Sequence, residues 1–264
     1  MQSHPHTHTR YESMLPFLWG YSGLLFVIGF LVESPSNILA GLWKIILTED
    51  ALITDYVLVA GTGAALVNAA LVTALSIFIL WRAEVPCNGV TLVIMGLMSG
   101  FSLFGKNFLN IWPIIFGTWL YAKSRKEAFG KYAATGLMAT ALAPIVSYFV
   151  LDNVWRSLPA GILAGMLVGF IMPALSSYTY KVQNGMNLYN IGFACGLLAF
   201  LIVPLISSLG ATPTVRYEWA VGLDPAFLFL ILTLSISLIF SGLFLCKRPA
   251  REAIMAVSYT HLRA

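Results

Sequence analysis

Eight stretches of this chain run for 16 to 34 residues without a single Asp, Glu, Lys or Arg. They cover residues 13–32, 56–81, 85–105, 107–122, 132–151, 157–180, 182–215 and 225–246. A helix needs about 20 mostly apolar residues to cross the hydrocarbon core of a bilayer. The sequence therefore predicts an all-α, polytopic membrane helix bundle of about eight transmembrane helices, with the transmembrane domain at residues 13–250. The stretch 107–122 would reach only about 24 Å, so a half-helix is one interpretation of it.

Composition excludes several classes of protein. Hydrophobic residues make up 59% of the chain and charged residues only 10%, against about 25% charged residues in soluble domains. This excludes a soluble globular enzyme, a disordered protein and a nucleic-acid-binding protein. The three cysteines, Cys87, Cys195 and Cys246, share no close spacing, so neither a metal site nor a disulfide framework is predicted.

Both ends of the chain differ from the apolar stretches. Residues 1–12 are expected to form a disordered cytoplasmic tail, in which His4, His6 and His8 are interpreted as tail residues rather than metal ligands. The last eight residues, 257–264, resemble a translated cloning sequence. They are interpreted as a non-native tail and excluded from the fold.

The basic residues favour one orientation. With the N-terminus in the cytoplasm and eight alternating spans, eleven Lys and Arg residues fall inside and four outside, as the positive-inside rule predicts. The segment KSRKEAFGK at residues 123–131 is the strongest marker of the cytoplasmic side. We therefore expect a multi-pass protein of the inner (cytoplasmic) membrane, in contact with the lipid bilayer and with both termini inside.

One short motif occurs twice. GKNFLNI begins at Gly105, and GMNLYNI begins at Gly185, 80 residues later. The first copy opens the fourth predicted span and the second opens the seventh, so the two copies face opposite sides of the membrane. This is typical of an inverted-topology repeat. The sequence predicts a 3+3 repeat with units at about residues 56–122 and 132–209.

Each copy of the motif carries one Gly and two Asn residues, which are Gly105, Asn107 and Asn110 in the first copy and Gly185, Asn187 and Asn190 in the second. A carboxamide is uncharged and can both donate and accept hydrogen bonds. Two interpretations stay open. The Asn side chains either cap helices and join neighbouring ones, or line a solute path where the two helix openings meet near the midplane. In both cases the glycines suit a close backbone approach or a chain reversal.

Two more polar residues, one inside an apolar stretch and one between two stretches, are candidates for a structural or functional role. Asn68 lies among Ala and Gly in the second stretch and is interpreted as an interhelical contact or a pore residue. Lys106 is expected to extend to the outer surface at a hairpin turn, and the alternative is a pore-facing cation that favours anions. Since the spans otherwise hold almost no acid, base or histidine, the sequence favours passive conduction of an uncharged solute over ion coupling.

Two segments resemble known families. GKNFLNIWPIIFGTWLYAKSR and GMNLYNIGFACGLLAF resemble an uncharacterised bacterial multi-pass membrane family, defined only as a domain of unknown function. That resemblance covers most of residues 14–250 and implies membrane residence. A local likeness to the motif of bacterial urea transporters is carried by Tyr189, Asn190, Gly192 and Gly196 and, less closely, by Asn110 and Gly117. The likeness implies a pore for a small neutral solute, although the proline-rich selectivity segments of that family are absent.

The sequence thus predicts a channel-like transporter of a small, uncharged polar solute. Its path would be framed by Asn107, Asn110, Asn187, Asn190, Gly105, Gly185 and Asn68. No enzyme motif occurs, so no catalytic activity, cofactor or metal is predicted. The alternative is a non-transporting membrane scaffold or assembly partner, and a homo-oligomer stays open. A membrane enzyme with inward-facing titratable residues is the least favoured interpretation.

Overall fold

The computed structural model describes residues 5–50, 54–151, 156–182, 190–208, 210 and 218–245. Within them the regular elements are helices, namely α1 (Pro5–Val32), α2 (Pro35–Leu47), α3 (Tyr56–Ala60), α4 (Thr62–Arg82), α5 (Gly89–Phe101), α6 (Trp112–Ser124), α7 (Gly130–Ala139), the 3-10 turn η1 (Thr140–Leu142), α8 (Pro144–Leu151), α9 (Leu158–Val182), α10 (Asn190–Ser208) and α11 (Asp224–Leu245). The all-α prediction is confirmed for the described residues. Gly185 and Asn187 of the second motif, residues 1–4 and the tail at 257–264 lie outside them.

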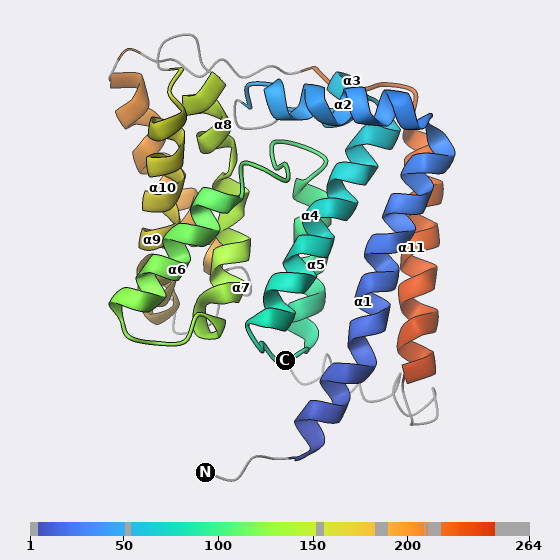
Figure 1. Cartoon of the computed structure of the whole chain (residues 1–264), viewed down its shortest axis with the longest axis horizontal. Coiled ribbons are helices and arrows are strands. Elements are labelled where there is room, and N and C mark those ends of the chain that lie inside the picture. Colours follow the sequence, from blue (N-terminus) through green and yellow to red (C-terminus); the bar gives the residue numbers. More distant parts are fainter. Residues whose placement is uncertain are drawn as a thin grey trace. The chain divides into compact units, whose positions relative to one another are not determined.

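The chain divides into two compact units. The larger one covers residues 18–219 and contains most of α1 together with α2 to α10 (Figure 1). The other consists of residues 1–17 and 220–264, and its described part holds the first residues of α1 and the apolar helix α11. The candidate site lies within the larger unit.

Four of the described helices contain segments that are long and apolar enough to cross a membrane, at Met14–Val32, Thr62–Arg82, Leu158–Val182 and Asn190–Ser208. Helices α7 and α8 provide a fifth if they form one span that is bent by 48°. By contrast, α5 and α6 have 13 residues each, which corresponds to only about 20 Å. These helices support a membrane protein, and the count of eight spans stays a prediction.

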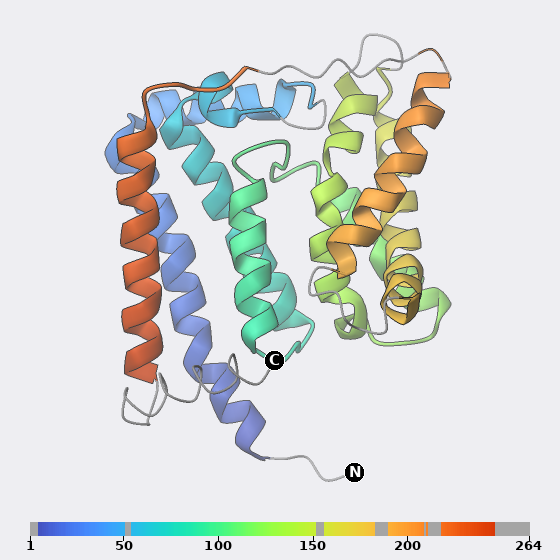
Figure 2. The ribbon, with the colours of Figure 1, turned by 180° about the vertical axis from the view of Figure 1, so that it is seen from behind.

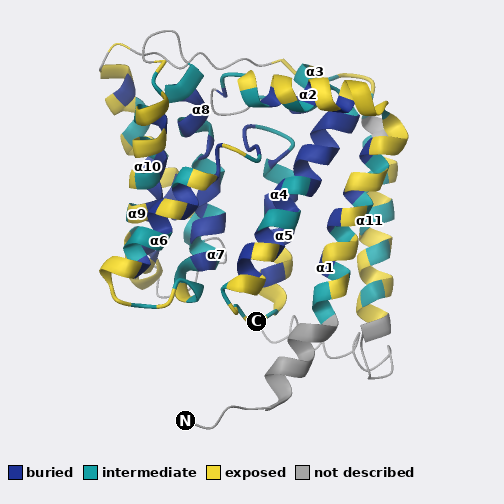
Figure 3. Cartoon of the chain, viewed as in Figure 1, coloured by how far each residue is buried: buried dark blue, intermediate teal, exposed yellow. Residues whose placement is uncertain are grey.

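Burial separates an inner helix from outer ones. In α4, 72% of the apolar window is buried, against 22% in α10, and Figure 3 shows α4 in the buried colour along most of its length. The exposed positions of α10 include large apolar side chains such as Phe200 and Leu201. Lipid tails solvate such a surface without the cost of exposing it to water. The outer helices are therefore suited to a lipid environment.

Backbone contact between α6 and α9 depends on glycine. Three glycines recur at every fourth position of α9, namely Gly161, Gly165 and Gly169. A Cβ atom on Gly169 would overlap the carbonyl of Ile114, and one on Gly117 would overlap the backbone of Met166. At the same contact, Thr118 Oγ1 donates to the carbonyl oxygen of Gly169 at 3.0 Å. This small-residue packing fixes the position of α6, and α6 in turn fixes one end of the α5–α6 loop.

Candidate functional site

Most of the loop that joins α5 to α6, residues 102–111, is buried although it is not helical, and Leu109 is its exposed residue. Ser102, Lys106, Asn107 and Asn110 are between 0 and 4% exposed. Figures 1 and 2 show the loop beneath α2, and α5 and α6 both run from it towards the opposite end of the larger unit. Buried backbone away from water must find its hydrogen-bond partners within the protein. The residues that satisfy this loop define the candidate site.

Asn68 attaches the start of the loop to α4. Its Nδ2 donates to the carbonyl oxygen of Ser102 at 2.7 Å and to that of Lys106 at 2.9 Å. Asn68 itself is 2% exposed. The sequence interpretation of Asn68 as a polar contact within the bundle fits this geometry, but its partner is loop backbone rather than a second helix.

Within the first motif, the two Asn side chains cap each other's backbone. Asn107 Oδ1 accepts from the backbone N–H of Leu109 and of Asn110, both at 2.9 Å. In return, Asn110 Oδ1 accepts from the backbone N–H of Asn107 at 2.9 Å. This is the geometry of a capping box, and it forms the turn that precedes α6. Gly105 has a φ of 77°, which favours glycine over residues with a side chain.

Asn110 also connects the loop to two other parts of the larger unit. Its Nδ2 lies 3.0 Å from the carbonyl oxygen of Gly105, 3.0 Å from Ser147 Oγ on α8 and 3.4 Å from Asp50 Oδ2. A carboxamide nitrogen has two hydrogens, so both are used within the protein. Asn110 is therefore the point where the α5–α6 loop, α8 and the α2–α3 connection meet.

Asp50 belongs to this cluster and was not among the predicted site residues. It lies in the connection between α2 and α3, outside the long apolar helices, and is 1% exposed. The Tyr56 hydroxyl donates to its Oδ2 at 2.9 Å, whereas its buried Oδ1 has no hydrogen-bond partner among the described residues. Burial raises the pKa of Asp50 from 3.8 to about 7, against the lowering effect of the Ser147 and Tyr56 hydroxyls.

Lys106 is buried, with 1% exposure, so the expectation that its side chain extends to the outer surface is wrong. Its Nζ lies 3.3 Å from Met98 Sδ and 5.2 Å from the centre of the Phe101 ring. No carboxylate in the described part of the chain lies within salt-bridge distance of Lys106. A thioether and an aromatic ring hold this ammonium group in place of an anion.

The second motif is described only from Asn190 onward. Thr179 Oγ1 donates to Asn190 Oδ1 at 2.7 Å, and Asn190 Nδ2 donates to the carbonyl oxygen of Ser176 at 2.8 Å. Both partners lie on α9, so Asn190 ties the first residue of α10 to the preceding helix. Among the described residues, no hydrogen bond joins Asn190 to the first motif.

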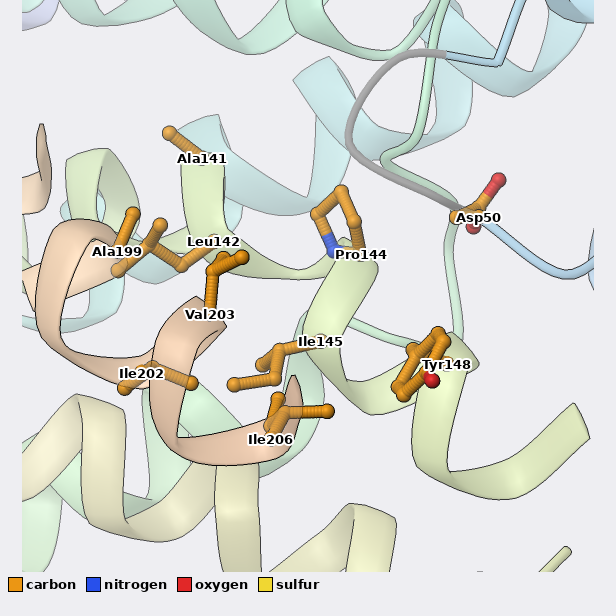
Figure 4. A pocket seen from close by; sticks show the side chains of 10 residues that line it. All are labelled: Asp50, Ala141, Leu142, Pro144, Ile145, Tyr148, Ala199, Ile202, Val203 and Ile206. Atoms are coloured by element: carbon orange, nitrogen blue, oxygen red, sulfur yellow. The ribbon is translucent and has the colours of Figure 1, made fainter. Parts of the chain in front are cut away.

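A pocket of about 90 Å³ adjoins the cluster. Figure 4 shows Asp50 and Tyr148 on one side of it and aliphatic side chains from η1, α8 and α10 on the other. These aliphatic residues are Ala141, Leu142, Pro144, Ile145, Ala199, Ile202, Val203 and Ile206. Asp50 thus links the hydrogen-bonded cluster to an apolar cavity between α8 and α10. The sequence signal for this pocket was weak, because its lining is typical of any apolar helix.

Comparison with known proteins identifies a family without an assigned activity. A family model described as "Protein of unknown function (DUF1576)" matches residues 34–208, a range that includes every residue of the candidate site. No curated protein and no solved structure matches the chain. The resemblance of the two motif segments to a domain of unknown function is thereby confirmed.

Proposed function

We propose that this chain, which belongs to the DUF1576 family of unknown function, is a membrane transport protein that carries a small polar solute past the buried α5–α6 loop. The observation that carries the proposal is the loop itself. Two helices too short to cross a bilayer are joined by buried, non-helical backbone that is held by Asn68, Asn107 and Asn110. Irregular backbone at membrane depth is tolerated where it is buried in protein or lines a cavity, and interrupted helices form the substrate sites of many transporters.

The structure broadens the class of solute that the sequence predicts. The sequence favoured an uncharged solute because the apolar stretches hold almost no acid or base. Asp50 and Lys106 are both buried in the larger unit, and this removes that reason. The proposal therefore covers small polar solutes, of which urea is one because of the local motif likeness. A catalytic activity is not part of it.

The inverted repeat also belongs to this proposal. The α5–α6 loop lies on the side of α2, whereas the end of α9 and the start of α10 lie at the opposite end of the larger unit (Figure 2). Opposite ends are what an inverted pair requires, and this supports the repeat. The pairs differ in length, with 13 residues in each of α5 and α6 against 25 in α9 and 19 in α10.

Solute flux into proteoliposomes tests transport directly. Stopped-flow light scattering would compare the wild type with empty liposomes for urea, formamide, glycerol and methylammonium chloride. Asn110→Ala and Ser147→Ala each remove one partner of the 3.0 Å hydrogen bond in the cluster, and we expect both to change the flux. Ser207→Ala on α10, whose hydroxyl bonds only within its own helix, is the matched control. Swelling rates equal to those of empty liposomes for every solute would contradict transport of this class.

A membrane scaffold is the second candidate, because the described Asn side chains of both motifs bond mainly to the protein itself. Carboxamides used in this way stabilise helix packing and need no solute. In a scaffold, Asn110→Ala would lower the melting temperature in detergent while flux of every solute stayed at the level of empty liposomes. A variant that loses flux at an unchanged melting temperature would favour transport.

A further inference from the structure

The unpaired oxygen of Asp50 suggests what the adjacent pocket binds. Oδ2 of Asp50 already accepts from Tyr56 and lies near Asn110 Nδ2, and both of these groups are hydrogen-bond donors. The Ser147 hydroxyl also acts on this carboxyl group and lowers its pKa, yet Oδ1 is buried without a partner at hydrogen-bond geometry in the described part of the chain. A buried carboxyl oxygen without a donor is costly. Asp50 lines the adjacent pocket, but a water-sized probe does not reach Oδ1 in this orientation of the carboxyl group. A ligand in the pocket that brings its own donor would remove the cost once the carboxyl group turns towards it.

Among the residues that the structure describes, no positive charge faces Asp50. The titratable groups that face it are Glu49 from the same connection, Tyr56 from α3 and Tyr148 from α8. None of them is a cation, and in the described residues Asp50 forms no salt bridge. Beyond the carboxyl, the pocket is lined almost entirely by aliphatic side chains. The site therefore combines one acidic end with an apolar body.

We propose that this pocket binds a small organic ammonium ion, with its amine against Asp50 and its hydrocarbon part between α8 and α10. The pocket volume of about 90 Å³ exceeds the roughly 10–15 Å³ that a single water needs, so it admits a short alkyl chain. This inference rests on the proposed transport function in one respect, because it takes the bound ammonium ion as the class of solute that is carried. Binding itself does not require that the ligand crosses the membrane.

Three probes of matched size and different end groups test the proposal. n-Butylamine, 1-butanol and butyrate would be added to the wild type in detergent, and binding would be followed by the melting temperature and by calorimetry. We expect n-butylamine to bind at least tenfold more tightly than 1-butanol, and butyrate to show no binding. Equal binding of n-butylamine and 1-butanol would overturn the proposal and identify an apolar hole that lipid tails or detergent fill.

Variants assign the selectivity to the two halves of the pocket. Asp50→Asn should abolish the preference for the amine over the alcohol, and Ala199→Leu should fill the apolar part and remove binding of both. Gly196→Ala lies on the same helix with nothing within 4 Å of the added Cβ atom, and it should bind n-butylamine like the wild type. The probe comparison in the wild type decides the proposal even if Asp50→Asn does not fold. An amine preference that persists in a folded Asp50→Asn variant would contradict the role of Asp50.

The pH dependence gives an independent readout. An alkylammonium ion stays protonated up to about pH 10, whereas the Asp50 carboxyl ionises around pH 7. Affinity for n-butylamine should therefore rise about tenfold from pH 6 to pH 8, as the carboxylate fraction rises. An affinity that is constant over this range in the wild type would contradict the proposal. Amine binding without solute flux in proteoliposomes would leave this site in place and refute transport instead, so the two failures are distinguishable.

Discussion

Asn68 shows at the scale of one residue how a long buried helix holds an irregular loop. Its two hydrogen bonds to the carbonyls of Ser102 and Lys106 satisfy backbone that has no helical partner. We expect Asn68→Ala to lower the melting temperature in detergent, since a buried carbonyl without a donor costs about 1–3 kcal/mol. Thr73→Val on the same helix is the control, because the Thr73 hydroxyl bonds only to Ala69 of its own helix. Equal effects of the two variants would contradict the role of Asn68.

Asp50 gives a prediction about stability and pH. Its pKa is raised to about 7 in the folded protein, so between pH 4 and 7 the folded state holds a proton that the unfolded chain has lost. The stability should therefore fall as the pH rises through this range, by an amount on the order of 4 kcal/mol for a shift of about three units. Melting temperatures at pH 5 and pH 8 should diverge more for the wild type than for Asp50→Asn, which cannot ionise. Parallel pH profiles would refute this assignment.

Single residues also show which parts of the site the sequence could reveal. Asn68, Asn107 and Asn110 stood out because polar side chains are rare in long apolar stretches, and all three hold the buried loop. The sequence carries no signal for Asp50, because it lies in the polar segment Thr48–Glu49–Asp50 between two stretches, where carboxylates are ordinarily exposed. The burial of Lys106 is equally absent from the sequence pattern. Its partners are Met98 and Phe101, which carry no sequence signal for binding a cation.

At the scale of elements, the contact between α6 and α9 leaves no space for a side chain at Gly169. Alanine normally stabilises a helix by up to about 1 kcal/mol relative to glycine. At Gly169, however, a Cβ atom would overlap the carbonyl of Ile114 on α6. We expect Gly169→Ala to lower the melting temperature and Gly196→Ala, which has open space around it, to leave it unchanged or raise it slightly. A stable Gly169→Ala variant would mean that the two helices do not touch through their backbones.

The lengths of the elements were harder to predict than their type. Residues 85–105 and 107–122 were counted as two spans because they contain no charged residue. In the structure α5 ends at Phe101 and α6 begins only at Trp112. Between them, Gly105 has a positive φ, and Asn107 and Asn110 turn the chain. The absence of charged residues indicates that a stretch can lie in lipid or in a protein interior. It does not indicate where a helix ends within that stretch.

For the whole chain, the short helices α5 and α6 affect the predicted number of membrane crossings but not the predicted side of the membrane for each loop. If α5 and α6 enter and leave the membrane at the same face, the chain crosses it about six times instead of about eight. Since two is even, every segment after α6 stays on the side that the eight-span prediction gives it. Both predictions therefore place the segment 123–131 and the two termini inside and α2 outside. The excess of basic residues on the inner side therefore agrees with both counts.

Cysteine labelling separates the two counts. After replacement of Cys87, Cys195 and Cys246, single cysteines would be placed at Ser36 on α2, at Ser124 at the end of α6 and at Lys106. Ser36 and Ser124 are exposed and Lys106 is buried. With a membrane-impermeant maleimide we expect Ser36→Cys to react in intact cells, Ser124→Cys only after permeabilisation, and Lys106→Cys under neither condition. Labelling of Lys106→Cys in intact cells would show that α5 and α6 each reach the outer surface, and reaction of Ser124→Cys there would reverse the orientation.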